Sequence, residues 1–367
     1  MQTRVFHSTV TADGKLRLSI DDVELDAGPD DVIVRVDAAP INPTDIFLML
    51  SMADVAQAVS RDGVLEVPLA PALLTAFAAR VDKPIPIGTE GAGMVIAAGA
   101  SSAAQALLGK IVALHAGGMF ASHRKLPAAA VQPLPAGSTA VDGASAFVNP
   151  MTALSFVETM RAEGHTAIVH TAAASNLGQM LVRICAADGV PLVNIVRRAE
   201  HVQQLRALGA TYALDSSTPT FKQELAAAIA ETGATIAFDA IGGGTLGSTI
   251  LDAMERAAAR KMKAYSHYGS STLKQLYIYG GLDRAPTQLV RSFGMSWSAG
   301  GYLVMNALRK LGAEVAARMT ARVMSELTTT FSSTYRQRIT LDRLVDADTV
   351  RAFAQMSTGE KFLLVGS

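Results

Sequence analysis

The sequence predicts an α/β protein in which an antiparallel, barrel-like β domain is joined to a second domain with a doubly wound parallel sheet. Residues 1 to about 140 contain short β-rich runs separated by glycine turns, whereas buried-type strands and helices alternate after Pro150. The chain has 367 residues, 50% of them hydrophobic, which is enough for two domains with large cores. Such a fold needs no disulfide or structural metal.

The charges are balanced, with 32 basic and 32 acidic side chains. The chain therefore has no overall cationic field, and we expect neither a nucleic acid nor a membrane as a partner. Cys185 is the single cysteine, which excludes an internal disulfide and a zinc site built on several thiolates. Residues 1–10 lack the features of a secretory signal, and the uncharged stretch 91–109 is interrupted by glycines, so we expect a cytoplasmic protein without a transmembrane helix.

The β-rich first part contains runs of β-branched residues that we expect to be strands. Turn-forming pairs such as Asp13-Gly14 and Gly28-Pro29 separate them. The expected strands are residues 5–10, 31–38, 93–97 and 109–115.

The second part shows the alternation that is typical of βαβ units, which wind right-handed on a parallel sheet. The expected strands are residues 166–170, 192–196, 211–214, 235–238 and 263–266, and the expected helices are 177–187, 199–208, 221–230, 246–257 and a longer helical run over 301–327. Two last strands, 335–339 and 361–365, follow the doubly wound unit. We therefore assign residues 1–145 and 331–367 to the first domain and 146–330 to the second.

The strongest local signal is the turn from Thr171 to Gly178, where the first parallel strand becomes a helix. A tight turn at this place lets backbone N–H groups and the positive helix end meet a pyrophosphate. In the G-x-G-x-x-G frame, Ala173 and Ser175 occupy the first two glycine positions and Gly178 the third. The alternative is a turn of small residues that is capped by Ser175 or Asn176 and binds no ligand.

The second strand ends in Arg197 and Arg198. An NAD site usually has a carboxylate at this position, whereas guanidinium groups suit the 2′-phosphate of NADP. The two arginines therefore favour NADPH as cofactor, although exposed arginines without a ligand are also common.

Six motifs along nearly the whole chain resemble the zinc-independent members of the medium-chain dehydrogenase/reductase superfamily, near the quinone oxidoreductases and enoyl thioester reductases. The ordered set is specific for the superfamily but not for a substrate. The motifs are Ile41-Asn42-Pro43-Thr44-Asp45, Gly88-Thr89-Glu90-Gly91-Ala92-Gly93, Asn149-Pro150-Met151-Thr152-Ala153, Ala174-Ser175-Asn176-Leu177-Gly178-Gln179, Val196-Arg197-Arg198 and Gly359-Glu360-Lys361.

The resemblance implies a GroES-like catalytic domain, a Rossmann domain that binds NADPH, an active site in the cleft between them, and a homodimer paired edge to edge through residues 275–278. It also implies the contacts of the cofactor. These are Asn42 and Thr152 near the nicotinamide, Ser175, Asn176 and Leu177 at the pyrophosphate, Arg197 and Arg198 at the 2′-phosphate, and Ala240, Ile241, His267, Tyr268 and Gly269 at the nicotinamide ribose. Asn149 and Ala173 are further cofactor-binding candidates within the same motifs.

Two departures from the family pattern stand out. No tyrosine, histidine or cysteine lies between Asn42 and Glu90, where enoyl thioester reductases carry a proton-donating tyrosine. The same interval contains an insertion at 51–83, whose apolar spacing predicts short helices. The insertion is either a lid or wall of a substrate pocket, or a dimer-contact or packing element.

A hydride donor without a metal needs an acceptor that spreads charge by conjugation, so we expect a metal-free reductase of quinones or conjugated carbonyls. Asn42, through its amide, and Thr44, through its hydroxyl, are the candidate oxyanion contacts, with His267 and Tyr268 as alternatives. Asn42 can equally be an Asn-Pro turn residue, and we expect Asp45 to cap a helix. Two other functions stay open: an enoyl-thioester reductase, and an NADPH-binding protein without turnover.

Overall fold

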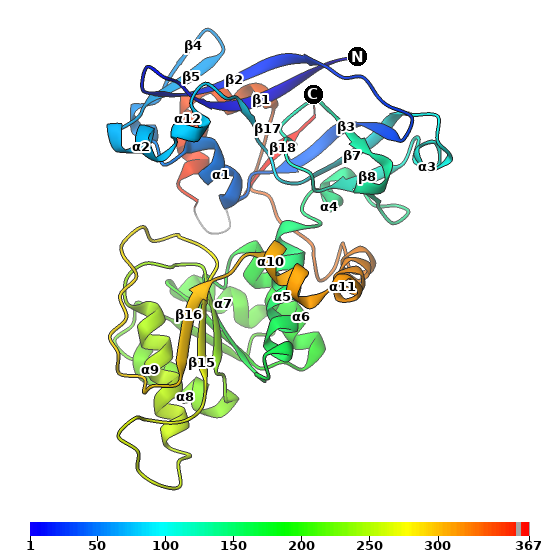
Figure 1. The fold of residues 1–367 in the computed structure, drawn as a ribbon. Coiled ribbons are helices and arrows are strands. Elements are labelled where there is room, and N and C mark those ends of the chain that lie inside the picture. Colours follow the sequence, from blue (N-terminus) through cyan, green and yellow to red (C-terminus); the bar gives the residue numbers. More distant parts are fainter. Residues whose placement is uncertain (357–360, 367) are drawn as a thin grey trace. The chain divides into compact units, whose positions relative to one another are not determined.

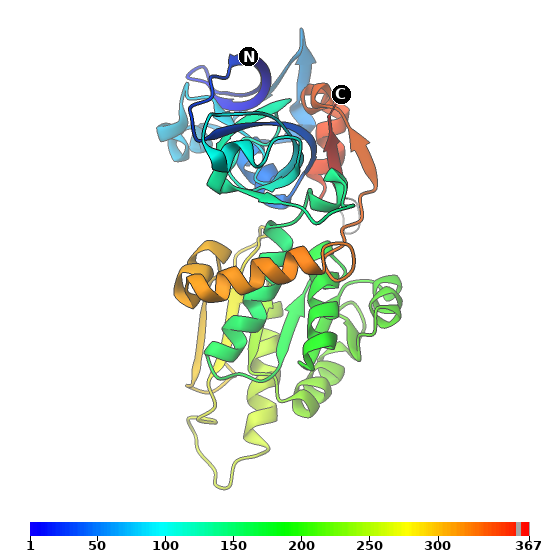
Figure 2. The same ribbon diagram turned by 90° about the vertical axis from the view of Figure 1, so that its right-hand side faces the viewer.

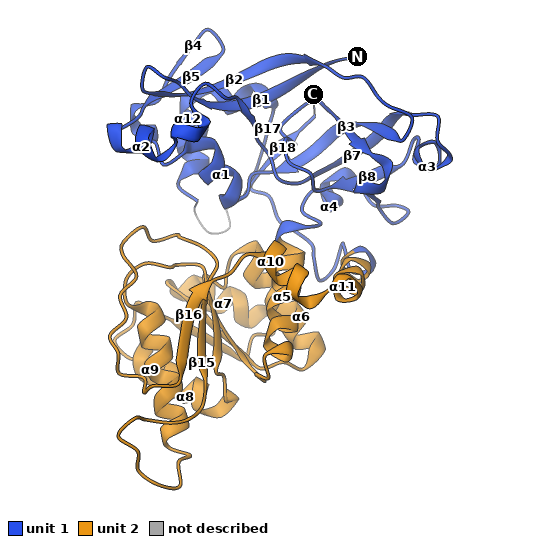
Figure 3. Ribbon diagram, viewed as in Figure 1, with its two compact units in different colours: residues 1–148, 324–367 blue, residues 149–323 orange. Residues whose placement is uncertain are grey.

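The structure is a computed structural model that describes residues 1–356 and 361–366. The chain forms two compact units (Figure 3). Unit 1 consists of Met1–Val148 and Met324–Ser367, and unit 2 of Asn149–Val323. The chain therefore crosses between units after 148 and 323, where the sequence analysis expected 145 and 330.

Unit 1 is built on two sheets. One has the strand order β4-β5-β2-β1-β6, and the other has β10-β8-β7-β3-β18-β17, with β9 also paired to β3. The strands are β1 (Gln2–Val10), β2 (Lys15–Glu24), β3 (Asp31–Pro40), β4 (Val59–Arg61), β5 (Val64–Pro68), β6 (Ile85–Pro86), β7 (Gly91–Ala98), β8 (Ile111–Leu114), β9 (His123–Pro127), β10 (Val131–Pro133), β17 (Gln337–Ile339) and β18 (Phe362–Val365).

The second sheet brings the two ends of the chain together. β18 pairs with β3 antiparallel, and Leu364 lies opposite Ala39. Figures 1 and 2 show these last strands beside the strands of the first segment. The predicted return of the C-terminus to the first unit is therefore seen in the strand pairing. The core between the sheets includes Phe6, Leu18 and Phe120, which are fully buried.

Short helices complete unit 1. They are α1 (Pro43–Leu50), η1 (Val55–Gln57), α2 (Pro71–Ala76), η2 (Ala78–Arg80), α3 (Ser102–Gln105), η3 (Ala128–Ala130), α4 (Ala140–Gly143), η4 (Leu341–Val345) and α12 (Ala347–Ala354). Unit 2 begins on α5 (Val148–Ala162).

Unit 2 is a parallel sheet with the order β13-β12-β11-β14-β15-β16. Helices α8 and α9 pack together on one side of it, and α5 and α6 lie on the other (Figure 1). The elements are β11 (Ile168–Thr171), α6 (Asn176–Asp188), β12 (Leu192–Val196), α7 (Ala199–Ala207), β13 (Tyr212–Asp215), α8 (Phe221–Thr232), β14 (Ile236–Asp239), α9 (Leu246–Ala259), β15 (Lys274–Ile278), β16 (Trp297–Gly301), α10 (Val304–Leu311) and α11 (Ala313–Ser325). The predicted fold class, a β-rich unit plus a doubly wound α/β unit, is confirmed.

The predicted fifth parallel strand at 263–266 is wrong. That segment has no regular secondary structure, and the fifth strand is β15, which begins at Lys274. Lys274 is fully buried because its ammonium group pairs with the carboxylate of Glu255 on α9. A lysine usually lies exposed, so the sequence indicated only a pairing edge at 275–278 and not that this run is the fifth strand of the sheet.

The predicted dimer edge at 275–278 is also wrong. β15 pairs with β14 on one side and with β16 on the other, so it offers no free edge. The outer strand of the sheet is β16.

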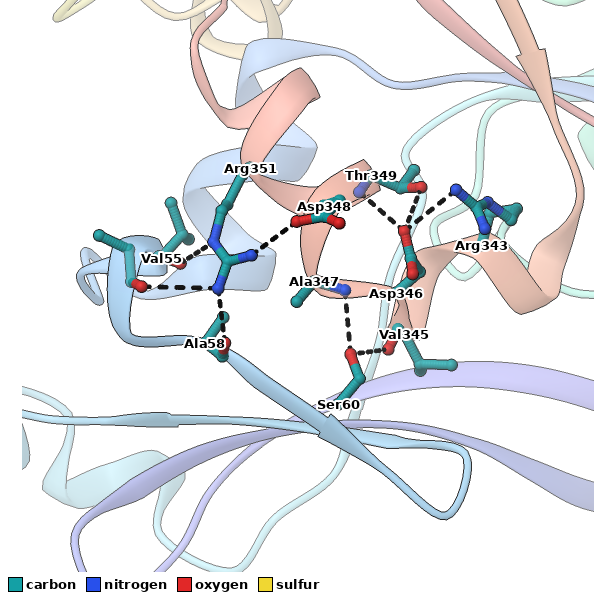
Figure 4. Close-up of polar contacts among 11 residues, drawn as sticks. Val55, Ala58, Ser60, Arg343, Val345, Asp346, Ala347, Asp348, Thr349 and Arg351 are labelled. Carbon is teal, nitrogen blue, oxygen red and sulfur yellow. Dashed lines mark hydrogen bonds and ion pairs between the residues drawn. The ribbon is translucent and has the colours of Figure 1, made fainter.

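The insertion at 51–83 contains a β-hairpin, β4–β5, in addition to the expected short helices. Asp62 and Gly63 form its turn with φ of 51° and 75°. Hydrogen bonds tie the insertion to the C-terminal segment of unit 1. Arg351 donates to the carbonyls of Val55 and Ala58 (Figure 4). The hydroxyl of Ser60 donates to the carbonyl of Val345 and accepts from the backbone N–H of Ala347. These contacts make the insertion a packed part of unit 1.

Candidate functional site

The first group of candidate residues lies at the carboxyl edge of the parallel sheet in unit 2. β11 is flanked by β12 on one side and by β14 on the other. The connections from β11 and β14 therefore leave the sheet in different directions, which is the switch point where α/β sheets bind nucleotides. The turn after β11, Arg197 and Arg198 after β12, and Ala240 and Ile241 after β14 meet at this edge.

The turn after β11 is held close to the sheet. Ala172 adopts the left-handed conformation with φ of 50°, one residue before the position that the glycine frame predicted. Ala173 then donates its backbone N–H to the carbonyl of Ile195 at 3.2 Å, and Ser175 caps α6 by accepting from the N–H of Gly178 at 3.2 Å. Ser175 therefore performs the capping role that the sequence analysis left open, and the positive end of α6 lies at this turn.

Gly178 is required by close packing. A Cβ atom at this position would lie 2.1 Å from the carbonyl oxygen of Ala173. The glycine lets the first turn of α6 approach the preceding loop, as a dinucleotide turn requires.

The loop after β14 is tied to the same turn. The Thr171 hydroxyl donates to Oδ1 of Asp239 at 2.6 Å and accepts from the N–H of Ala240 at 2.8 Å. Asp239 also accepts from the N–H groups of Ile241 and Gly242. No role was predicted from the sequence for the side chains of Thr171 and Asp239, because both look like ordinary strand-end residues.

Arg197 and Arg198 are exposed at the end of β12. Arg198 forms an exposed ion pair with Glu200 at 3.2 Å. No carboxylate ends the strand itself, so the guanidinium groups remain accessible to an anion.

His267, Tyr268 and Gly269 are misplaced in the sequence analysis. They precede β15, at its amino end, because the fifth strand begins at Lys274 and not at 263. The carboxyl end of β15 leads into Tyr279, whose hydroxyl lies 2.7 Å from Nε2 of the buried His170. Burial lowers the pKa of His170 to about 3, so this histidine is neutral.

Asn149 and Thr152 lie in the first two turns of α5. Asn149 is half-buried and Thr152 is buried. Their predicted contact with the cofactor stays a prediction.

The second group of candidate residues is a buried polar cluster in unit 1, around the start of α1. Asn42 caps this helix, and its Nδ2 donates to Oε1 of Glu90 at 3.0 Å. Asp45 accepts from the backbone N–H of Asn42 at 2.9 Å and from the Thr89 hydroxyl at 2.5 Å. Asp45 therefore has the expected capping role. Thr44 is exposed on the same turn.

Charged groups are concentrated in this cluster. Oε2 of Glu90 accepts from the backbone N–H groups of Phe147 and Val148, at 2.9 and 2.8 Å. Lys361 donates to the hydroxyl of Ser145 at 2.9 Å. Burial raises the pKa of Asp45 to about 6 and also raises that of Glu90, while it lowers the pKa of Lys361.

The cluster unites three of the sequence motifs, which contribute Asn42 and Asp45, Thr89 and Glu90, and Lys361. Gly359 and Glu360 of the last motif lie outside the described residues. Asn42 keeps 1% of its surface exposed, and its amide nitrogen is already bonded to Glu90. The structure therefore supports a helix-capping role for Asn42 in place of a free amide donor.

Within 1–356 and 361–366, no three His, Cys, Asp or Glu side chains are grouped so that they can hold a metal ion. Cys185 is buried, and burial raises the pKa of its thiol to about 12. No helix in the described part of the chain is long and apolar enough to cross a membrane.

Comparison with solved structures defines the fold. A putative NADPH:quinone reductase from Mesorhizobium loti superposes with a TM-score of 0.72 at 22% identity, covering 99% of this chain and 98% of that one. A mutant enoyl thioester reductase from Candida tropicalis gives 0.70 at 19% identity over 100% of both chains. The Etr1p complex with NADP and crotonyl-CoA gives 0.71 at 19% identity over 100% of both chains.

The chain has the medium-chain dehydrogenase/reductase fold. The resemblance to the zinc-independent members of this superfamily, predicted from the motifs, is thereby confirmed at the level of the fold. No protein-family model matches the chain.

Curated relatives match over part of the chain. The human synaptic vesicle membrane protein VAT-1 homolog is 28% identical over 165 residues, which are 44% of this chain and 41% of that protein. The mitochondrial enoyl-[acyl-carrier-protein] reductase of Xenopus tropicalis is 29% identical over 192 residues, 50% of this chain and 47% of that protein. The matches thus span less than half the length of these relatives.

Proposed function

We propose that this protein is an NADPH-dependent, metal-free reductase that transfers hydride to a quinone or a conjugated carbonyl. The proposal rests mainly on the arrangement of residues at the carboxyl edge of the sheet in unit 2. There a low turn at the N-terminus of α6 lies beside two exposed arginines, with no carboxylate at the end of β12. The solved relatives support the same cofactor, since one is a putative NADPH:quinone reductase and another is a complex with NADP.

The residues at this edge suit a phosphorylated dinucleotide. Gly178 lets the helix end approach closely, and Ser175, Asn176 and Leu177 open the helix where a pyrophosphate binds in this fold. Arg197 and Arg198 supply cationic groups for the 2′-phosphate. Ala240 and Ile241, held by Asp239, would contact the ribose.

Bound NADPH supplies a hydride, and the chain's part is to bind, orient and exclude water. Thr44, with an exposed hydroxyl on α1, is the proposed contact of the acceptor oxygen. Since no other strong proton donor is at hand in this motif, an acceptor whose conjugation delocalises the developing charge suits the site best.

An enoyl thioester is the second candidate acceptor. It is favoured by the relatives, which include an enoyl-[acyl-carrier-protein] reductase and a complex with crotonyl-CoA. The absence of a tyrosine between Asn42 and Glu90 argues against it, because this chain then lacks the donor expected from the family pattern.

The test follows NADPH absorbance with a panel of quinones, alkenals, enones and enoyl thioesters, together with metal analysis of the purified protein. We expect turnover with a quinone or enone and no bound zinc. If NADPH binds but no acceptor is reduced, the proposed reductase activity is wrong and the protein only binds NADPH. Stoichiometric zinc would exclude the metal-free mechanism.

We further propose that the protein forms a homodimer that pairs the outer strand β16, where Ser298 to Gly301 are exposed. Sedimentation of the purified protein, compared with a variant carrying Ala299→Pro, tests this pairing. A monomeric wild-type protein contradicts it.

A further inference from the structure

The loop of residues 260–273, which joins α9 to β15, projects from unit 2 beyond the ends of the neighbouring helices in both views (Figures 1 and 2). Tyr265 keeps 92% of its surface exposed, and Tyr268 keeps 63%. Aromatic rings contribute most to stability when they are buried, so the fold gains little from either side chain. Two exposed rings three residues apart on a projecting loop indicate a surface that contacts a partner.

Positive charge lies beside these tyrosines. Four cationic side chains are exposed between the end of α9 and the tip of the loop, and no acidic residue occurs over residues 256–282. They are Arg256, Arg260, Lys261 and Lys263. Arg256 pairs with Asp252 at 2.7 Å, whereas no carboxylate of the described residues pairs with the other three. The balanced total charge of the chain therefore conceals a local excess of positive charge.

The foot of the loop is fixed by a buried carboxylate. Oε1 of Glu255 accepts from the backbone N–H of Ser270 at 2.7 Å, and Oε2 accepts from the Ser270 hydroxyl at 2.6 Å. Lys274 balances the charge of Glu255 in the same buried site. A Cβ atom at Gly269 would lie 2.6 Å from Oε1, so the glycine lets the chain pass close to the carboxylate. The loop therefore leaves the sheet at a defined point.

An exposed methionine lies next to the tip of the loop. The backbone N–H of Met295 donates to the carbonyl of Tyr268 at 3.0 Å, and Met295 is 74% exposed. Two segments of the chain thus bring aromatic and apolar side chains to the same place, beside the cations of the loop. Amphipathic rings, apolar side chains and lysines together are typical of a surface that lies in the interface of a membrane.

We propose that the tip of this loop, residues 260–268 together with Met295, binds the surface of a membrane that contains anionic lipids. The cations contact the phosphate and carboxylate groups of the lipids, while the tyrosine rings and the methionine enter the boundary between headgroups and acyl chains. This inference does not depend on the proposed function. It replaces the expectation that the protein has no membrane partner, because that expectation rested on the total charge.

A single-stranded nucleic acid is the other polyanion that cations and aromatic rings can bind. Proteins of that kind line a groove with positive charge and stack successive bases on their aromatic rings. The loop is instead a projecting tip (Figure 2), and an exposed methionine supplies neither a phosphate contact nor a stacking face. A membrane surface therefore fits these residues better.

The loop lies far along the sheet from the residues proposed to bind NADPH. It enters β15 at Lys274, at the amino end of the strand, whereas those residues lie at the carboxyl edge. Substitutions at the tip should therefore leave both the melting temperature and the dissociation constant of NADPH unchanged. The two measurements show that a variant is folded, independently of its binding to lipid.

The experiment is cosedimentation of the full chain with vesicles of phosphatidylcholine alone, or of phosphatidylcholine with about one-third phosphatidylserine. We expect binding to the mixed vesicles only, and weaker binding as salt is added. Lys261→Gln with Lys263→Gln should weaken binding about thirtyfold. The matched control, Lys110→Gln with Lys222→Gln at exposed positions elsewhere, makes the same change in net charge and should weaken binding less than about threefold.

Two further variants test the aromatic contact. Tyr265→Ser with Tyr268→Ser should weaken binding about tenfold, because the rings no longer leave water. Tyr265→Trp should retain binding, and its indole emission should shift to shorter wavelength with the mixed vesicles but not with phosphatidylcholine alone.

Wild-type protein that does not sediment with the mixed vesicles overturns the inference, and so does equal binding by the lysine variant of the loop and its control. Titration of a fluorescent single-stranded oligonucleotide gives the remaining outcome. If the oligonucleotide binds through the loop lysines while the vesicles do not bind, the partner is a nucleic acid and the inference is wrong. Failure of the proposed function looks different, because it appears as a lack of NADPH oxidation and leaves vesicle binding unaffected.

Discussion

Thr171 and Asp239 form a hydrogen bond across the point where the strand order of the parallel sheet reverses. The hydroxyl of Thr171 ends β11 and lies 2.6 Å from Oδ1 of Asp239, which ends β14. The same hydroxyl accepts the N–H of Ala240, so one side chain fixes both loops that leave the switch point. The two loops proposed to bind opposite parts of one dinucleotide are therefore held in a defined register.

Replacing Thr171 with valine should lower the free energy of unfolding by about 2 kcal/mol, because Ala240 then keeps a buried N–H without an acceptor. NADPH affinity should fall with it. Thr171→Ser retains the hydroxyl and is the control. Chemical denaturation measures the effect, and equal stability of the valine and serine variants would contradict it.

Gly178→Ala should destabilise the protein by more than about 2 kcal/mol, because the new Cβ meets a backbone carbonyl that cannot move freely. The control is Gly189→Ala at the other end of α6. Gly189 has φ of 66° with open space around it, so its cost is the left-handed strain alone, about 1 kcal/mol. Thermal unfolding of both variants compares the two costs, and a smaller loss at Gly178 would be inconsistent with the close approach.

Arg197→Ala and Arg198→Ala should each raise the dissociation constant of NADPH by about tenfold while leaving that of NADH almost unchanged, since only NADPH carries the 2′-phosphate. Arg206→Ala, exposed on α7, is the matched control. Wild-type protein that binds NADH as tightly as NADPH would refute the assignment.

Arg351→Ala should free the insertion from α12, because the guanidinium satisfies carbonyls at both ends of η1 (Figure 4). We expect faster amide exchange over residues 55–61 and a loss of about 1–2 kcal/mol. Arg343→Ala is the control, since Arg343 pairs with Asp346 by an exposed ion pair of little energetic value. Unchanged exchange in the Arg351 variant would show that the guanidinium is not needed to hold the hairpin.

Asp45 should make stability depend on pH. Burial raises its folded-state pKa to about 6 from an ordinary value near 3.8. Between these two pH values, the Asp45 carboxyl group is ionised in the unfolded chain but still protonated in the folded chain. The free energy of unfolding therefore falls by about 3 kcal/mol as the pH rises from about 4 to 6. In Asp45→Asn this contribution should be lost, and only the fall that Glu90 adds, because burial also raises its pKa, should remain. Denaturation across this range measures both slopes, and parallel curves would mean that Asp45 titrates normally.

Sequence reasoning succeeded where structure is local. β12 was placed at its observed bounds, and α6 and α8 to within a few residues, because apolar periodicity and nearby caps determine such elements. The hairpin β4–β5 was missed although Asp62-Gly63 carries the usual two-residue turn signal. That error came from weighing apolar spacing above turn chemistry.

Two other errors, on the fifth strand and on the edge of the sheet, could not have been avoided from the local sequence. Lys274 starts a buried strand only because Glu255, on the preceding helix, neutralises it. The edge of the sheet could not be assigned until β16 was seen to pair with β15. Such features depend on partners that the chain brings from a distance.

The sequence by itself determined the doubly wound alternation, the small-residue turn closed by Gly178, and the arginine pair after the second strand, since each is encoded within a few neighbouring residues. Only the tertiary structure decided what the buried polar residues do. The orientation of the Asn42 amide depends on Glu90, 48 residues away, and the raised pKa of Asp45 depends on removal of water by the surrounding core. Hydrogen-bond partners and desolvation are properties of the packed chain, because no local segment can supply either.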